Sequence, residues 1–316
     1  MHHTKSLSRA SRPWKGLPAE LSRQSRPARA SRAAVERTVH GLFFLCGCLA
    51  VASVLFISVY LVASGLPAML ETGVTAFLFG PVWGGKNGPY GILPFLLTSL
   101  AGTAGAMLLG VPVGVLTALF LAKAAPERLA VIIRSAVSLL AGIPSVVYGL
   151  VGMVVLVPRV QRLFGLASGA CLLAAIAVLS VMILPSIINV AETALRAVPK
   201  EYEEASLALG ATRMETIFRV SLPAARSGIA AAVVLGVGRA VGEAMAVIMV
   251  SGNVANLPGL FTPVRFLTTA IASEMNYAST GSLWRQSLYS IGLVLFLFIM
   301  LINVCLNVFI KNRKEV

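Results

Sequence analysis

The sequence predicts an all-α integral membrane protein, and three observations support this fold class. Of the 316 residues, 57% are hydrophobic and only 12% are charged, whereas soluble domains are about 25% charged. The mean hydropathy is high, at +0.87. Six apolar stretches are each long enough to cross a hydrocarbon core of about 30 Å, which takes about 20 helical residues. We therefore expect a chain that crosses the membrane several times.

The six predicted transmembrane helices form one domain over residues 41–310. GxxxG spacings at Gly110/Gly114 and at Gly238/Gly242 favour close approach between helices. The predicted spans cover residues 41–66, 92–122, 130–157, 170–194, 227–251 and 284–310.

The basic residues predict the orientation of the chain. Residues 1–40 carry nine Lys and Arg against two Glu, a composition typical of a disordered tail. Twenty Lys and Arg fall on the predicted inner side and five on the outer side. The positive-inside rule therefore places both termini, including the short tail 311–316, in the cytoplasm. This distribution accounts for the net charge of +14, so nucleic acid is not expected as a partner.

A polar, highly charged stretch lies between two spans, in the loop 199–223, which is predicted to be cytoplasmic. Pro199 suits the first turn of a helix, and Gly210 suits a left-handed helix cap. Thr212 and Glu215 have the spacing of a capping box. These residues predict two short helices joined at a glycine. Physical chemistry alone leaves an ordinary amphipathic loop as an equal alternative.

The span after this loop contains two ionisable residues, Arg239 and Glu243. Their separation of four residues places them on one helix face. A charge at mid-membrane costs about 2.5–3.5 kcal/mol on insertion scales, so both should face the bundle interior or a water-filled path. One interpretation is a salt bridge that neutralises itself. The other is that Arg239 binds an oxyanion by forked hydrogen bonds.

Three polar residues inside apolar segments are further candidates for the pathway: Tyr148, Ser145 and Thr98. The alternative is that each is hydrogen-bonded within the bundle. The loop and the span of Arg239 are adjacent in the chain. A movement of the Glu204–Gly210 elbow is therefore expected to reach Arg239 along one helix.

The loop also resembles a known family. Glu204-Ala205-Ser206, Gly210 and Val220-Ser221-Leu222-Pro223 match the EAA loop of ABC-importer permeases, E-A-A-x3-G-x9-I-x-L-P, and depart from it only at Ser206 and Val220. The resemblance extends over about residues 40–310. YGILPFLLTSLAGT (90–103), LLAGIPSVVYGL (139–150) and GVGRAVGEAMAV (236–247) are similar to phosphate-importer permeases of the PstC type.

This resemblance implies a MetI-like fold and an inner-membrane permease subunit of an ATP-driven importer, which passes inorganic phosphate by alternating access. It implies that the EAA loop contacts the ATPase through Glu204, Ala205, Gly210, Leu222 and Pro223. The implied partners are a PstA-type permease, a PstB-type ATPase dimer, a PstS-type periplasmic phosphate-binding protein and membrane lipid. ATP and Mg would be used by the ATPase, with no cofactor or metal bound by this chain.

Two alternatives stay open. The cargo is another oxyanion, such as phosphonate, sulfate or molybdate, or the chain is a membrane scaffold that senses phosphate without passing it. The Arg239/Glu243 pair argues against a pure scaffold, which has no need of charges inside the membrane. The sequence contains no catalytic constellation, so we expect that the chain is not itself an enzyme.

Overall fold

A computed structural model of the chain describes residues 27–312. The chain divides into two compact units, residues 1–59 and 60–316. Most of the predicted disordered tail, residues 1–26, lies outside the described residues, as do residues 313–316. For residues 27–40 the prediction of disorder is wrong, because helix α1 begins at Pro27. This stretch is rich in Ala and Arg, both strong helix formers, and local propensity prevails over net charge there.

The described part of the chain is helical, and its only β contacts are two isolated bridges, Trp83 with Tyr90 and Gly252 with Val264. The elements are α1 (Pro27–Thr72), α2 (Val74–Phe79), η2 (Gly85–Asn87), α3 (Leu93–Leu119), η3 (Phe120–Ala124), α4 (Glu127–Gly142), α5 (Ser145–Val151), η4 (Gly152–Leu156), α6 (Val157–Phe164), α7 (Leu172–Arg196), α8 (Lys200–Ala208), α9 (Arg213–Thr216), η5 (Ile217–Ser221), α10 (Leu222–Ala224), α11 (Arg226–Gly242), α12 (Met245–Val250), α13 (Leu267–Glu274) and α14 (Leu283–Asn312).

Within residues 27–312, five helical segments are long and apolar enough to cross a membrane: Glu36–Thr72, Leu93–Ala124, Ser145–Phe164, Leu172–Arg196 and Leu283–Cys305. A sixth is formed if Arg213–Ala224 and Arg226–Gly242, which meet at a bend of 68°, count as one span. The structure thus confirms the all-α membrane fold class.

Two predicted spans are wrong as single helices, because each is interrupted. The span 130–157 breaks between α4 and α5, where Ile143 and Pro144 are extended, with ψ of 127° and 141°. The residue before a proline is disfavoured in the helical region, which explains the position of this break. The span 227–251 breaks after Gly242, and Glu243 is extended with ψ 129°.

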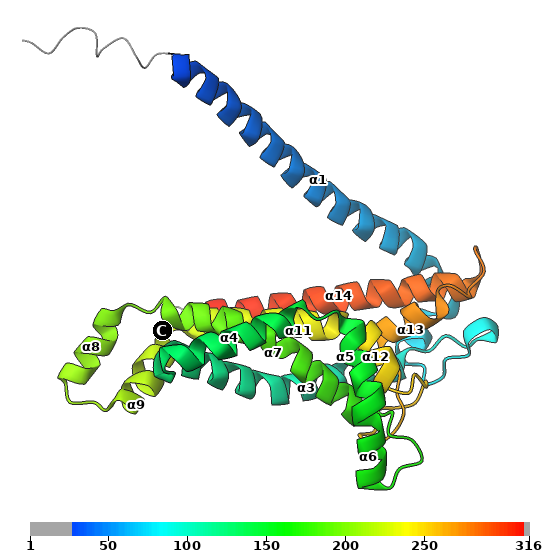
Figure 1. The fold of residues 1–316 in the computed structure, drawn as a ribbon. Coiled ribbons are helices and arrows are strands. Elements are labelled where there is room, and N and C mark those ends of the chain that lie inside the picture. Colours follow the sequence, from blue (N-terminus) through cyan, green and yellow to red (C-terminus); the bar gives the residue numbers. More distant parts are fainter. Residues whose placement is uncertain (1–26, 313–316) are drawn as a thin grey trace, which may run out of the picture. The chain divides into compact units, whose positions relative to one another are not determined.

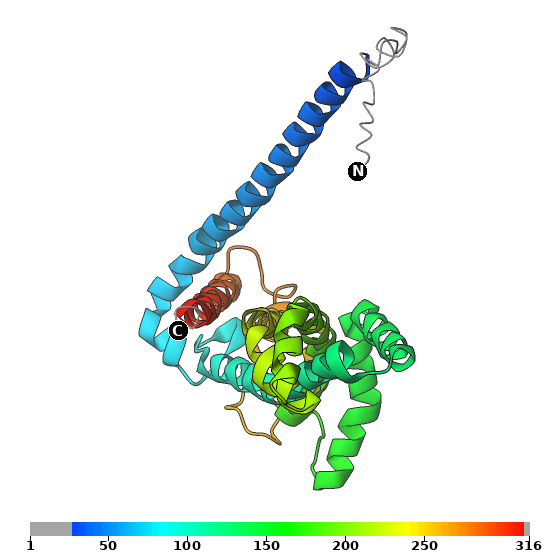
Figure 2. The same cartoon turned by 90° about the vertical axis from the view of Figure 1, so that its left-hand side faces the viewer.

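The core of the larger unit is built around α7, which packs against α3 and α11. These helices and α14 run along one another (Figure 1), and a view from the side of the loop helices shows α14, in red, at the edge of the group (Figure 2). Gly110 and Gly114 allow α3 to approach α7 closely. A Cβ atom there would lie 2.6 Å from Ile183 and 2.8 Å from Ile187. By contrast, nothing described lies within 4 Å of a Cβ at Gly238 or Gly242.

The two ends of this bundle carry different structures. Helices α8 and α9 project at one end, and α13 lies at the other (Figure 1). The residues around Arg239 lie between these ends, on helices packed against the buried face of α7. A movement of the projecting helices therefore has to cross packed helices before it reaches Arg239.

Candidate functional site

The two helix breaks lie next to each other. Helix α5 packs on α12 in the same direction, because Gly149 faces Ala246 and Gly152 faces Val250. The beginnings of both short helices, and the extended residues before them, are therefore neighbours. Irregular backbone at membrane depth is tolerated only where it is buried in protein or lines a water-filled cavity. This pair of breaks marks the region where a polar path is physically possible.

Arg239 lies in the last turn of α11, beside this region. Its Nη1 donates a hydrogen bond of 3.2 Å to Oγ of Ser186 on α7. The side chain is partly buried, and no carboxylate pairs with it among residues 27–312. The negative end of the α11 dipole favours a cation at this position. The guanidinium thus keeps a positive charge and several free N–H donors.

Glu243 does not share a helix face with Arg239, and that prediction is wrong. Helix α11 ends at Gly242, so the extended backbone of Glu243 directs its carboxylate to the start of α12. There Oε1 accepts a hydrogen bond of 3.0 Å from the backbone N–H of Ala246. The backbone oxygen of Glu243 accepts a bond of 2.7 Å from Thr268. The self-neutralising salt bridge is therefore absent from the described part of the chain.

None of the three other candidate residues forms a hydrogen bond with Arg239, although Tyr148 is close enough to interact with it electrostatically. The hydroxyl of Tyr148 donates a 2.7 Å bond to the carbonyl of Leu140, across the break between α4 and α5. Ser145 is partly exposed at the start of α5. Thr98 is completely buried, and its hydroxyl has no described partner. It precedes Gly114 by 16 residues on α3, about 24 Å along the helix, so Thr98 lies far from the level of Ser186.

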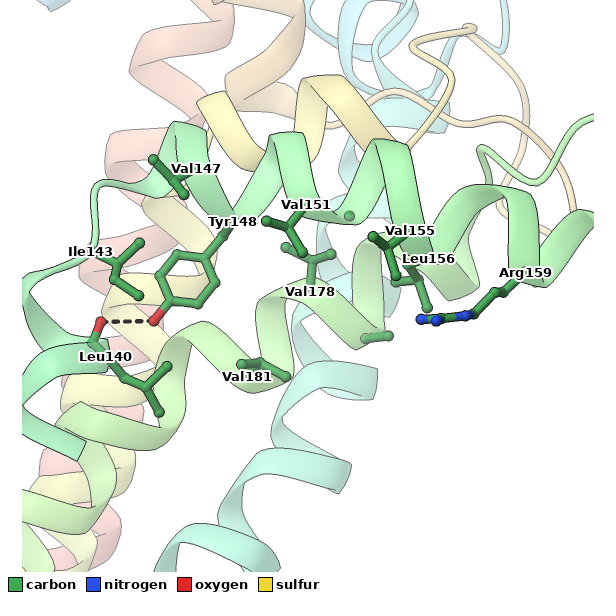
Figure 3. Close-up of a pocket in the computed structure, with 12 residues that line it drawn as sticks. Leu140, Ile143, Val147, Tyr148, Val151, Val155, Leu156, Arg159, Val178 and Val181 are labelled. Carbon is green, nitrogen blue, oxygen red and sulfur yellow. Dashed lines mark hydrogen bonds between the residues drawn. The ribbon is translucent and has the colours of Figure 1, made fainter. Parts of the chain in front are cut away.

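Tyr148 instead lines a separate cavity of about 450 Å³ between α5, η4 and α7. Figure 3 shows aliphatic side chains such as Val151, Val178 and Val181 along this cavity, with Tyr148 toward one end and Arg159 at the other. Arg239 does not contribute to its lining. The cavity is therefore distinct from the position of Arg239, although Tyr148 lines the cavity and also interacts electrostatically with Arg239.

The Tyr148→Phe variant tests the role of the hydroxyl. Its bond to Leu140 braces the helix break, and one neutral hydrogen bond contributes about 0.5–1.5 kcal/mol. We expect a small loss of thermal stability, in line with the loss of one neutral hydrogen bond. An unchanged melting curve would contradict a bracing role for the hydroxyl.

The loop 199–223 folds largely as predicted. Helix α8 is followed by Gly210 in a left-handed conformation, with φ of +87°. The capping box is present: Oγ1 of Thr212 accepts from the N–H of Glu215, and Oε2 of Glu215 accepts from the N–H of Thr212 at 2.9 Å. The pKa of Glu215 is lowered because its carboxylate accepts hydrogen bonds from the backbone N–H and then from the hydroxyl of Thr212, each at 2.9 Å. The second helical arm of the loop, residues 213–224, is less regular than expected, because the π-helical η5 interrupts it before it ends at Ala224.

The residues matching the EAA pattern lie mostly on the surface of this loop. Glu204, Ala205, Gly210 and Pro223 are exposed, and Leu222 is partly buried. Large apolar side chains are exposed beside them: Tyr202, Leu207, Leu209, Met214 and Phe218. Leu209 at the elbow is 90% exposed. Exposed large apolar side chains gathered on one loop are typical of a protein docking site.

Sequence reasoning missed a largely buried carboxylate at the opposite end of the bundle. Glu274 of α13 accepts hydrogen bonds from the indole N–H groups of Trp83, at 3.0 Å, and Trp284, at 2.8 Å. It also forms an ion pair with Arg265, whose guanidinium donates to the carbonyl of Asn253. Trp83 and Glu274 are 191 residues apart, so no local sequence pattern indicates this cluster.

Comparison with known proteins agrees with this architecture. Residues 110–312 match the family described as binding-protein-dependent transport system inner membrane component. The probable ABC transporter permease protein YqgH of Bacillus subtilis is 40% identical over 280 residues, covering 86% of this chain and 89% of that protein. The phosphate transport system permease protein PstC of Haemophilus influenzae is 35% identical over 262 residues, covering 76% and 82%.

Solved structures support the same fold. A structure of the inward-facing MetNI methionine ABC transporter matches with a TM-score of 0.56 at 22% identity, over 70% of this chain and 95% of that one. A second crystal form gives a TM-score of 0.52 at 24% identity, with 70% and 93% coverage. The family match and the relatives above 30% identity each cover most of the chain. The chain therefore belongs to the family of binding-protein-dependent transport system inner membrane components.

Proposed function

We propose that this chain is a PstC-type permease subunit of an ATP-driven importer and passes inorganic phosphate across the inner membrane. The family match makes the chain a transport subunit rather than an enzyme. The cargo is inferred from relatives of 32–37% identity that are named phosphate transport system permease protein PstC. The observation that carries the proposal is the charge of Arg239, which no described carboxylate neutralises.

An unpaired guanidinium inside a membrane requires compensation. A charged side chain there is costly unless it is paired or hydrated, and Arg239 has only a serine hydroxyl as its described partner. An oxyanion supplies both the opposite charge and the acceptor geometry that a guanidinium fork matches. We infer that phosphate neutralises the positive charge of Arg239 as it passes the two helix breaks.

The carboxylate of Glu243 can distinguish hydrogenphosphate from sulfate. Oε1 of its carboxylate is used by the N–H of Ala246, which leaves Oε2 free to accept another hydrogen bond. Hydrogenphosphate carries a proton that can be donated to this oxygen, whereas fully ionised sulfate has none. In this proposal Ser145 and Thr98 are secondary positions on the path, and Tyr148 mainly braces the adjacent break.

The rest of the transporter belongs to the same proposal. The exposed apolar elbow of the loop supports docking of a PstB-type ATPase dimer, which binds ATP and Mg, through Glu204, Ala205, Gly210, Leu222 and Pro223. A PstA-type permease completes the pathway, and a PstS-type periplasmic protein delivers phosphate. Both termini are then cytoplasmic, on the side of the loop.

Reconstitution tests this function. The chain is isolated with its co-purifying subunits and placed in liposomes, and ATP-driven uptake of labelled phosphate is measured against unlabelled phosphate, sulfate, molybdate and phosphonate. We expect only unlabelled phosphate to compete effectively. Equal competition by sulfate or molybdate would assign a different oxyanion. Absence of all uptake, with phosphate-dependent signalling intact in cells, would favour the scaffold instead.

A further inference from the structure

The two arms of the loop 199–223 converge on the end of α3. Glu203 of α8 forms an ion pair with Lys123 of η3 and accepts a 2.7 Å hydrogen bond from Ser221 of η5. Arg213, the first residue of α9, donates a 2.9 Å bond to the backbone carbonyl of Lys123. Both arms are therefore attached to one residue that lies outside the loop.

This attachment is stronger than an ordinary surface ion pair. The side chain of Lys123 is 11% exposed and that of Glu203 is 25% exposed, so water screens the pair only in part. Burial by itself would raise the pKa of Glu203, but the bonds from Lys123 and Ser221 outweigh it and lower the pKa. The carboxylate is therefore ionised at neutral pH. Charge-assisted hydrogen bonds of this kind are about twice as strong as neutral ones.

Lys123 connects the loop to the rest of the bundle. The segment η3 continues α3, and α3 packs against α7 through Gly110 and Gly114. Helix α7 also carries Ser186, whose hydroxyl oxygen accepts a hydrogen bond from Arg239. A series of direct contacts thus runs from Glu203 through Lys123, α3 and α7 to the guanidinium.

The covalent route is less direct than the sequence indicates. The expected single helix from the elbow to Arg239 is wrong, because the loop's second arm meets α11 at a bend of 68°. The π-helical turn η5 adds a second irregularity within that arm. Lys123 lies in η3, which is also π-helical, but η3 and α3 form one span, Leu93–Ala124, without a sharp bend. A displacement of Lys123 therefore acts directly on α3, whereas a movement along the chain has to pass the 68° bend.

We propose that Glu203 is the positioning residue that transmits movement of the loop 199–223, the coupling loop, to α3, and through α7 to the position of Arg239. The inference rests on the proposed function, in which an ATPase moves this loop. It differs from the EAA resemblance, which implies a role for the neighbouring Glu204. Glu204 is exposed and free to contact the ATPase, whereas Glu203 faces the membrane helices of its own chain.

The test compares Glu203→Gln with Glu201→Gln in the reconstituted complex. Glu201 is an exposed carboxylate of the same helix with no described partner, which makes it a matched control. We expect Glu203→Gln to lower the phosphate moved per ATP hydrolysed about ten-fold, the equivalent of about 1.4 kcal/mol, with the ATPase still bound. The charge exchange Lys123→Glu with Glu203→Lys should restore most of that ratio.

Three outcomes would overturn the inference: a ratio equal to that of Glu201→Gln, no recovery in the charge exchange, or loss of ATPase binding, which would make Glu203 a docking residue. A second measurement needs no cargo and separates this inference from the function. ATP should change the hydrogen exchange of backbone amides around Ser186 in the wild type but not in Glu203→Gln. The same change in both proteins would contradict the proposed route, whatever the cargo is.

Discussion

Replacing Arg239 with alanine is expected to abolish phosphate uptake while the protein stays inserted and assembled. The guanidinium lies beside the helix break after Gly242, and none of the described carboxylates pairs with it. Removing one partner of a buried, hydrogen-bonded charge pair costs about 2–5 kcal/mol, and each 1.4 kcal/mol corresponds to ten-fold. Uptake by reconstituted complexes should fall roughly 30-fold or more.

Two variants make this result specific. Arg162→Ala removes an exposed arginine of α6 whose Nε donates only to a backbone carbonyl one turn earlier, and it should leave uptake unchanged. Ser186→Ala removes the hydroxyl that orients Arg239, and the loss of one hydrogen bond predicts a two- to ten-fold decrease. Normal uptake by Arg239→Ala would remove this residue from the pathway.

Replacing Glu274 with leucine is expected to destabilise the end of the bundle opposite the coupling loop. The side chains of Arg265 and Glu274 are 17% and 15% exposed, so the substitution leaves a largely buried cation and two indole N–H groups without their acceptor. Breaking a buried ion pair costs about 3–5 kcal/mol. For 150–250 residues 3 kcal/mol lowers the apparent Tm by roughly 6–12 °C, and a chain of 316 residues is expected at the low end of this range.

Intrinsic tryptophan fluorescence is a suitable measurement, because two of the three tryptophans, Trp83 and Trp284, bind this carboxylate. The third, Trp14, lies outside the described residues. Glu274→Leu should shift the emission of the folded protein as well as its melting temperature. Glu71→Gln, at an exposed carboxylate near the end of α1, is the control and should change neither. An unaltered melting curve for Glu274→Leu would show that the cluster does not hold this end together.

The features that the sequence predicted well are governed by local chemistry. Long apolar runs identify the membrane helices because few other structures bury so many consecutive apolar residues. The capping box at Thr212 and Glu215, and the left-handed Gly210, follow from the preferences of residues three positions apart or less. The Arg239 charge was also visible in the sequence, because an ionisable residue inside an apolar run stands out.

The features it could not predict depend on tertiary structure. The contact between Glu274 and Trp83 joins residues 191 positions apart, and only the folded bundle brings them together. The break after Gly242 turned an apparent i,i+4 pair into two residues with different partners, Ser186 for Arg239 and Ala246 for Glu243. Helical periodicity places side chains correctly only as long as the helix continues. The break before α5 is easier to locate from the sequence, because Pro144 disfavours the helical conformation of the residue before it.

The central claim is that Arg239 binds the transported phosphate, and a structure of the complete complex with phosphate tests it most directly. We predict density for a tetrahedral anion within hydrogen-bonding distance of the Arg239 guanidinium, beside the breaks at residues 143–144 and 243–244. The claim would be contradicted by an Arg239 paired with a carboxylate of the second permease while phosphate occupies a site elsewhere.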